Sequence, residues 1–329
     1  YEAYKNNTLN ASESDLNIML SILTEALLKR GQRNTNLFLS GRPMIGSNED
    51  FKTANKDFQL AAELLGEDHP MYEQIISRSI FFGAMNQIQK GEDLNAAEKT
   101  LNKLIIQYPK AAHLNQGLAI LYIKKSEKSK AEEQLAKASE KVSTWTKPIN
   151  SAAYLNILAG NLDEANKNID ASEKLDENKD NAYLLKAYLY SAGYELQNAQ
   201  KALNNIKNEE GLLSNSELNE IEGKINELRG RITVAEKMYK ESLKENGNNV
   251  DLLLRLGNLY KNDGDTVSAL NYYNQVKRLD PKNQSAKANI ALLKNKEVII
   301  DNSLININNV SEVLFAVEVL EDKKEFGKA

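Results

Sequence analysis

The sequence predicts an all-α fold of stacked antiparallel helix pairs, from its length and from two periodic patterns. At 329 residues the chain exceeds the roughly 250–300 residues at which single hydrophobic cores stop growing. Alanine recurs at an interval of 34 residues with one two-residue slip, at Ala97, Ala131, Ala165, Ala199, Ala235 and Ala269. Such a fixed period indicates a stack of repeated units.

Two further columns accompany the alanines. Four positions after each stands a larger residue: Leu101, Leu135, Ile169, Leu203, Tyr239 and Tyr273. Twelve positions before each stands a small or flexible one: Met85, Ala119, Ala153, Ala187, Gly223 and Gly257. Helices approach closely only where the contact residues are small, and the large side chain one turn later fills the space toward the next pair. The columns therefore predict interlocking helix packing rather than a binding motif.

The N-terminal region, residues 1–77, is predicted to hold helices and a degenerate first unit. Residues 15–29 have the pattern of an amphipathic helix, and Ala54, Phe58 and Ala61 repeat the pattern of a second helix. Between them we expect a long loop at residues 30–50, which contains three glycines and a proline. Loops longer than about 12–15 residues are often functional or disordered, so both a passive excursion and a partner-contacting loop stay open.

The clearest copy of the repeat carries Leu253, Leu256, Gly257, Tyr260, Gly264, Ala269, Tyr273 and Pro281. It resembles the consensus of the tetratricopeptide repeat family at nearly every signature position. Gly264 stands where the first helix must turn into the second, and Pro281 lacks the N–H needed to continue a helix. By this resemblance the antiparallel helix pairs form a right-handed superhelix, and about six repeats cover residues 78–283, with degenerate units at both ends.

Residues 284–329 are predicted to form C-terminal capping helices. Residues 284–297 read as another first helix, and residues 311–324 carry Val313, Leu314, Val317 and Leu320 on one stripe. A solenoid needs a terminal cap over its last apolar face. A helix that docks a partner is the alternative for the last segment.

Composition excludes several kinds of chemistry. Cysteine is absent, so disulfides, thiolate metal sites and iron–sulfur clusters are excluded. The two histidines, His69 and His113, have no second ligand at metal spacing, and no phosphate-binding loop, nucleophile elbow or zinc-protease motif occurs. We therefore predict no enzyme, no catalytic residues, no metal and no cofactor.

Charge and hydropathy limit the partners and the location. The 42 basic and 46 acidic residues give a net charge of −4 without a basic stripe, so nucleic acid is not a predicted partner. No apolar stretch approaches the ~18 residues of a membrane span, and no signal peptide is visible. The Asn- and Lys-rich, Cys-free composition and the start at Tyr1 favour an exported protein, periplasmic or a membrane-anchored lipoprotein without its signal, over a cytoplasmic one. The oligomeric state stays open.

The resemblance implies that the first helix of each repeat lines a concave groove. Transferring the family's register places a partner-binding groove at Phe82, Asn86, Ile120, Ile123, Tyr154, Ile157, Leu158, Leu184 and Tyr188. The later repeats present charged residues there instead, namely Glu217, Glu220, Lys224, Glu227 and Lys261. An apolar patch of this extent usually marks an interaction site. A long N-terminal segment, the last helix or a second copy of the chain could also cover it.

The predicted function is a non-catalytic scaffold that binds a partner protein or peptide in the groove, within a bacterial multiprotein or envelope-associated assembly. The alternative is a solute- or lipid-binding protein whose superhelix encloses a small apolar ligand. Chaperone-binding members of the family use a clamp of Lys and Asn, whereas the corresponding pairs here are Phe82 with Asn86, Gln116 with Ile120, and Asn150 with Tyr154. A chaperone-tail adaptor is therefore not predicted.

Overall fold

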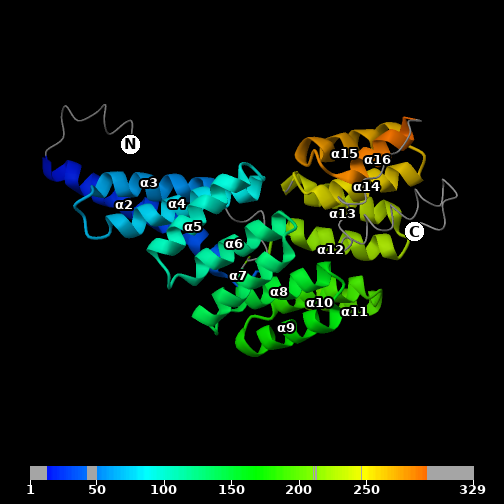
Figure 1. The fold of residues 1–329 in the computed structure, drawn as a ribbon, viewed down its shortest axis with the longest axis horizontal. Helices are drawn as coiled ribbons and strands as arrows, with labels where there is room; N and C mark the ends of the chain where they lie inside the picture. Colours follow the sequence, from blue (N-terminus) through cyan, green and yellow to red (C-terminus); the bar gives the residue numbers. More distant parts are fainter. Residues whose placement is uncertain (1–12, 43–49, 210, 212, 246, 295–329) are drawn as a thin grey trace. The chain divides into compact units, whose positions relative to one another are not determined.

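The computed structural model describes residues 13–42, 50–209, 211, 213–245 and 247–294 (Figure 1). The described part contains fifteen α-helices and no strand. It divides into two compact units: unit 1 comprises residues 1–40 and 48–144, and unit 2 comprises residues 41–47 and 145–329. No helix in the described part is long and apolar enough to cross a membrane.

Unit 1 is a series of helices in which sequence neighbours pack against each other. Its helices are α2 (Glu13–Leu39), α3 (Phe51–Leu65), α4 (Tyr72–Lys90), α5 (Leu94–Gln107), α6 (Ala112–Lys124) and α7 (Lys128–Lys141). Its core includes a cluster of phenylalanine rings from α2, α3 and α4. The rings of Phe58 and Phe82 stack with centroids 5.7 Å apart, and Phe38 meets Phe81 edge-on at 5.1 Å.

The loop predicted over residues 30–50 is wrong in its first half, because helix α2 continues through Leu39. A Cβ added at Gly31 would lie 2.7 Å from the Cζ atom of Phe58. This glycine therefore lets α2 approach α3 closely, and it does not mark a turn. Of the remaining loop, residues 43–49 lie outside the described residues.

Unit 2 continues the alternation of first and second helices. Its helices are α8 (Thr146–Leu158), α9 (Leu162–Leu175), α10 (Asp180–Ala192), α11 (Leu196–Asn204), α12 (Asn215–Leu228), α13 (Ile232–Glu245), α14 (Val250–Asn262), α15 (Thr266–Leu279) and α16 (Gln284–Leu293). The pairs α8 with α9, α10 with α11, α12 with α13, and α14 with α15 pack closely. The first helices α8, α10 and α12 also contact one another in order.

The predicted packing columns are confirmed. All six alanines of the 34-residue column are 0% exposed. A Cβ added at Gly223 or Gly257 would lie 2.5 Å from a ring carbon of Tyr239 or Tyr273 respectively. Each tyrosine ring therefore occupies the space that the missing glycine side chain leaves free, as the interlocking pattern requires.

The helix ends also agree with the sequence analysis, both in the clearest repeat and in the helix that follows it. Gly264, with a φ of 82°, forms the predicted turn between α14 and α15. Asn283 caps α16 by accepting a hydrogen bond from the Ala286 N–H at 2.9 Å. Helix α16 begins at residue 284, where the first helix of the C-terminal region is predicted to begin, while the predicted helix at residues 311–324 lies outside the described residues.

Candidate interaction site on the first helices of unit 2

The nine predicted groove residues are divided between the two units and differ in exposure. Phe82, Asn86, Ile120 and Ile123 lie in unit 1, and the other five lie in unit 2. Four of the nine are buried with at most 7% exposure: Phe82, Ile120, Ile157 and Leu184. Because these side chains fill contacts between helices, the surface left to a partner is smaller than the register implied. Leu158 is 45% exposed, and Asn86, Ile123, Tyr154 and Tyr188 are half-buried.

Two tyrosines from successive first helices meet in unit 2. Tyr154 of α8 and Tyr188 of α10 pack edge to face, with ring centroids 5.6 Å apart and an interplanar angle of 81°. This arrangement suits the quadrupoles of two aromatic rings. Burial raises the pKa of both phenols above their ordinary value, and Glu220 raises that of Tyr188 further. Both hydroxyls are therefore neutral hydrogen-bonding groups at physiological pH.

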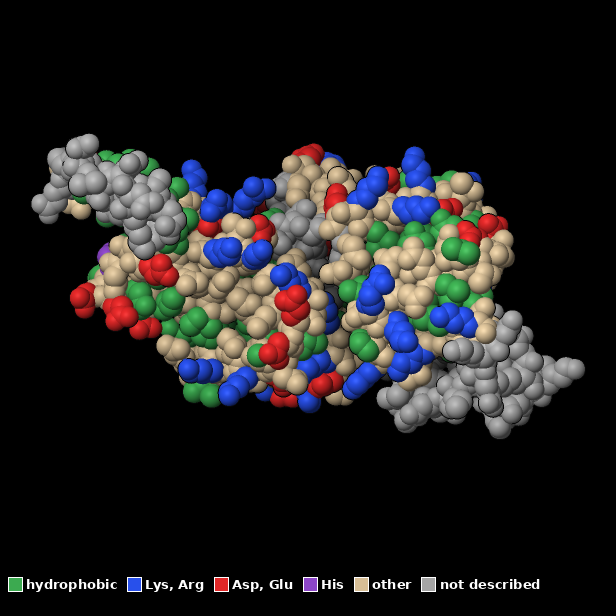
Figure 2. All heavy atoms as spheres, turned by 90° about the horizontal axis from the view of Figure 1, so that it is seen from above, with side chains coloured by type: hydrophobic (Ala, Val, Ile, Leu, Met, Phe, Trp, Pro, Cys, Tyr) green, Lys and Arg blue, Asp and Glu red, His purple; other side chains and the backbone are tan. Residues whose placement is uncertain are grey.

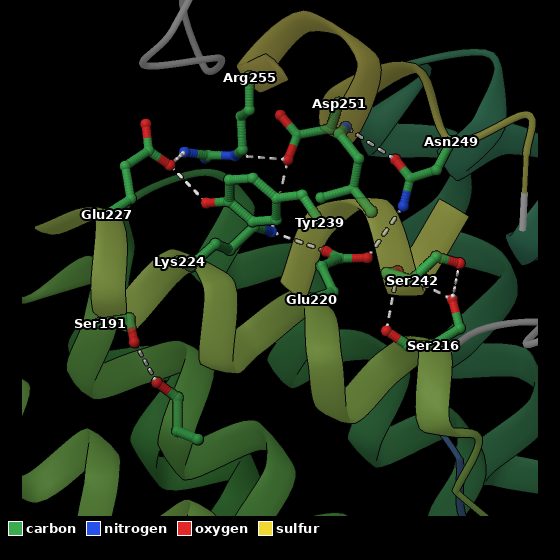
Figure 3. Close-up of polar contacts among 12 residues, drawn as sticks. Ser191, Ser216, Glu220, Lys224, Glu227, Tyr239, Ser242, Asn249, Asp251 and Arg255 are labelled. Carbon is green, nitrogen blue, oxygen red and sulfur yellow. Dashed lines mark hydrogen bonds and ion pairs between the residues drawn. The ribbon is translucent and has the colours of Figure 1, made fainter. Parts of the chain in front are cut away.

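Lys224 of α12 joins the tyrosine pair to a charged network. Its Nζ atom lies 5.1 Å from the centroid of the Tyr188 ring, within cation–π range. The same atom lies 2.8 Å from Glu220 Oε1 and 3.4 Å from Asp251 Oδ2 (Figure 3). Burial alone would lower the pKa of Lys224, but the two carboxylates raise it above its ordinary value, so the ammonium stays charged.

Arg255 of α14 extends the network toward α12. Its Nε atom lies 3.0 Å from Asp251 Oδ2, and its guanidinium lies 3.0 Å from Glu227 Oε2 (Figure 3). The Tyr239 hydroxyl donates a hydrogen bond to the same Glu227 carboxylate. Desolvation opposes ionisation of Asp251, yet Arg255 and Lys224 hold its pKa below the ordinary value. The Tyr239 ring is 0% exposed, so this network is anchored in the core.

We call Tyr154, Tyr188, Glu220, Lys224, Asp251 and Arg255 the tyrosine–charge face. Its charged side chains are between 13% and 42% exposed, so each is ordered by neighbours and still reachable from solvent. The sequence register identified Glu220, Lys224 and Glu227 but missed Asp251 and Arg255. Their spacing of four residues on one helix, matching that of Glu220 and Lys224, is the signal that could have found them.

A second cluster of polar contacts in unit 2 surrounds residues 41–42 of the same chain. The guanidinium of Arg42 is 0% exposed and lies 2.7 Å from Glu217 Oε2. The side-chain amide of Asn150 donates a hydrogen bond to the carbonyl oxygen of Gly41 at 2.6 Å. This segment is thus an intramolecular occupant of part of the first-helix surface.

The two histidines each contact a neighbouring group of the protein. His113 packs edge-on against Phe81 with centroids 5.1 Å apart, and burial together with Arg78 and Lys141 lowers its pKa to about 4. His69 Nδ1 accepts a hydrogen bond from the Met71 N–H at 3.2 Å. Among the described residues no three His, Asp or Glu side chains form a group suited to a metal ion.

On the face seen in Figure 2, basic and acidic side chains are intermixed.

Comparison with known structures assigns the architecture. The chain is an all-α repeat protein with a tetratricopeptide-type fold. It is similar to a tetratricopeptide repeat protein from Parabacteroides merdae, at a TM-score of 0.53 and 15% identity, over 83% of this chain and 99% of that one. No family model matches the sequence, and no curated protein matches it.

Two further solved structures share the fold. The Cut9–Hcn1 hetero-tetramer of the APC/C aligns with a TM-score of 0.54 and 14% identity, over 87% of this chain and 52% of that one. Yeast Tom70 aligns with a TM-score of 0.50 and 16% identity, over 97% of this chain and 67% of that one. At these identities the likeness concerns the fold alone.

Proposed function

We propose that the protein is a non-catalytic interaction scaffold and that the tyrosine–charge face binds a partner polypeptide. The observation that carries this proposal is the contact of the half-buried Tyr154–Tyr188 pair with the charged Lys224, whose own partners fix it in place. Aromatic anchors beside ordered charges are typical of the centres of protein interfaces.

The two halves of the face suit different parts of a partner. The rings of Tyr154 and Tyr188 offer a rigid apolar surface with few rotatable bonds, which costs little conformational entropy on binding. The carboxylates of Glu220 and Asp251, together with the adjoining Glu227, outnumber the cations Lys224 and Arg255, so the charged network favours a partner with basic side chains. The partner that we propose is thus a polypeptide with an apolar or aromatic side chain next to basic residues.

The cellular setting that we propose is a bacterial multiprotein or envelope-associated assembly. It rests on the Asn- and Lys-rich, Cys-free composition. It is independent of the binding face, which can be tested in any compartment.

The experiment is affinity capture from the native organism, followed by mass spectrometry and by measurement of the affinity for the captured protein. The variant is Tyr154→Leu with Tyr188→Leu, because leucine keeps apolar volume against the neighbouring core while removing the rings. We expect binding to weaken by more than tenfold, since aromatic anchors commonly contribute ≥2 kcal/mol each.

The matched control is Tyr194→Asn. Tyr194 is 69% exposed and has a φ of 58°, a conformation that asparagine tolerates. This variant should bind the partner like the wild type. Unchanged binding by the double leucine variant at native helicity would refute the proposed face. A small apolar molecule retained by the purified chain in native mass spectrometry would instead favour the ligand-binding alternative.

A further inference from the structure

Unit 2 holds the chain's own Gly41–Arg42 in a site built from three first helices and one turn. Thr146 and Asn150 come from α8, Asn181 from α10 and Glu217 from α12, while Asp176 follows the end of α9. We call these five residues the Gly-Arg site. The contacting residues are far apart in sequence: Asn150 is 109 residues from Gly41, and Glu217 is 175 residues from Arg42.

The first position of the site favours glycine. A Cβ at Gly41 would lie 2.7 Å from Thr146 Oγ1, 2.9 Å from Asn181 Nδ2 and 3.2 Å from Asp176 Oδ2. Three separate side chains would have to move to admit even an alanine. No positive φ is involved, so the preference for glycine arises from the surrounding side chains.

The site recognises main chain through buried amides. Asn150 is 0% exposed and donates to the Gly41 carbonyl at 2.6 Å. Its Oδ1 atom and that of Asn181 are buried and lack a hydrogen-bond partner among the described residues. Buried polar atoms are normally paired, and the N–H groups of a bound peptide are suitable donors for both.

The second position selects a guanidinium. Glu217 Oε2 accepts a hydrogen bond from the Arg42 guanidinium at 2.7 Å. The same oxygen accepts hydrogen bonds from the backbone N–H and the hydroxyl of Ser214, each at 2.9 Å. The carboxylate is thus held in place by the capping box at the start of α12. Such a preformed carboxylate in a closed site suits arginine, which donates through a rigid planar group.

We propose that the Gly-Arg site is a recognition site for a short Gly-Arg peptide and that Gly41–Arg42 is its built-in competing ligand. A partner polypeptide with an accessible Gly-Arg sequence would displace this segment. The inference rests on the proposed scaffold function and supplies the chemistry of one partner motif. Because the built-in ligand is tethered, its effective concentration is on the order of millimolar, and it weakens the apparent affinity for the partner.

The test uses the synthetic peptide Leu-Ser-Gly-Arg-Pro, which copies residues 39–43, and the full chain. Fluorescence of Trp145, the chain's only tryptophan and the neighbour of Thr146, follows binding, and calorimetry confirms it. Arg42→Ala should bind the peptide at least tenfold more tightly than the wild type, because the competing guanidinium is gone. Adding Glu217→Gln to Arg42→Ala should reverse this gain, and the peptide Leu-Ser-Ala-Arg-Pro should bind at least tenfold more weakly.

A second variant, Gly41→Ala, keeps the arginine but disfavours docking of the segment, and it should also bind the peptide more tightly than the wild type. If both variants keep native helicity and neither binds the peptide, the segment is a structural latch and the proposal is overturned. Loss of helicity in both variants overturns it as well, because a displaceable ligand cannot be required for folding. The assay needs no natural partner, so its failure leaves the tyrosine–charge face to be judged by the capture experiment.

Discussion

The two units share one packing scheme but bury different chemistry. Unit 1 fills the space between α2, α3 and α4 with phenylalanine rings, and two of its buried amides pair with each other, Asn115 with Gln134 at 2.7 Å. In unit 2 the buried amides Asn150 and Asn181 face the Gly-Arg segment. The comparison teaches that the small columns fix the helix pairs, while the other first-helix positions are left for support or for recognition.

The largest expected effect tests whether the phenylalanine cluster belongs to unit 1 alone. Phe82 is 2% exposed and stacks on Phe51 and Phe58, each at 5.7 Å. Phe82→Ala should cost about 3–5 kcal/mol, because truncation of a buried ring leaves a cavity. Hydrogen exchange should show lost protection in α2–α4 with α8–α15 unchanged. Equal loss in both units would mean that they unfold as one.

The next effect separates the units by pH. His113 in unit 1 has its pKa lowered to about 4, against about 6.5 when unperturbed. The folded state therefore favours the neutral ring, so this stabilisation is complete above pH ~6.5 and is lost as pH falls toward 4. The loss should amount to about 3 kcal/mol.

Denaturant melts of the full chain between pH 7 and pH 4 measure this dependence. Hydrogen exchange then shows whether it belongs to unit 1. His113→Gln should flatten it. The stability of unit 2 should not change over the same range. The pKa of Asp251 is below its ordinary value, so the stabilisation from its carboxylate is lost only under about pH 4. A pH dependence that persists in His113→Gln would assign the effect to other groups.

The smallest effect examines the tight column in unit 2. Gly257→Ala places a methyl group 2.5 Å from the Tyr273 ring and should cost about 1–3 kcal/mol through overpacking. Gly193→Ala is the control, because its Cβ would meet nothing closer than 3.6 Å. Thermal melts should therefore rank Gly257→Ala well below Gly193→Ala. Equal melting temperatures would show that the column tolerates larger residues than its packing indicates.

The sequence predicted the repeat well because its signals are local. Small and large residues at fixed spacing, such as Gly257 and Tyr273, have one packing solution once two helices pair. It misjudged Gly31, because a glycine used for close helix contact and a glycine in a loop look alike in a sequence.

The candidate site was only partly predictable, because the signals in the sequence are local. The register placed Tyr154 and Tyr188 on neighbouring first helices, and their rings are in contact. It could not separate them from Leu184 and Ile157, which are buried, because exposure depends on what packs from outside the repeat. The contact of Arg42 with Glu217 lies beyond any periodic pattern, since a repeat register relates only adjacent units.

The separation of Arg42 from Glu217 has a consequence during protein synthesis. The two residues are 175 positions apart, and at about 5–20 residues per second the ribosome needs on the order of 10–35 s to pass from one to the other. Throughout that interval the arginine has been made but its carboxylate has not. The contact of Gly41 with Asn150 can form as soon as α8 has been made, whereas the Arg42 guanidinium gains its carboxylate only once α12 has begun.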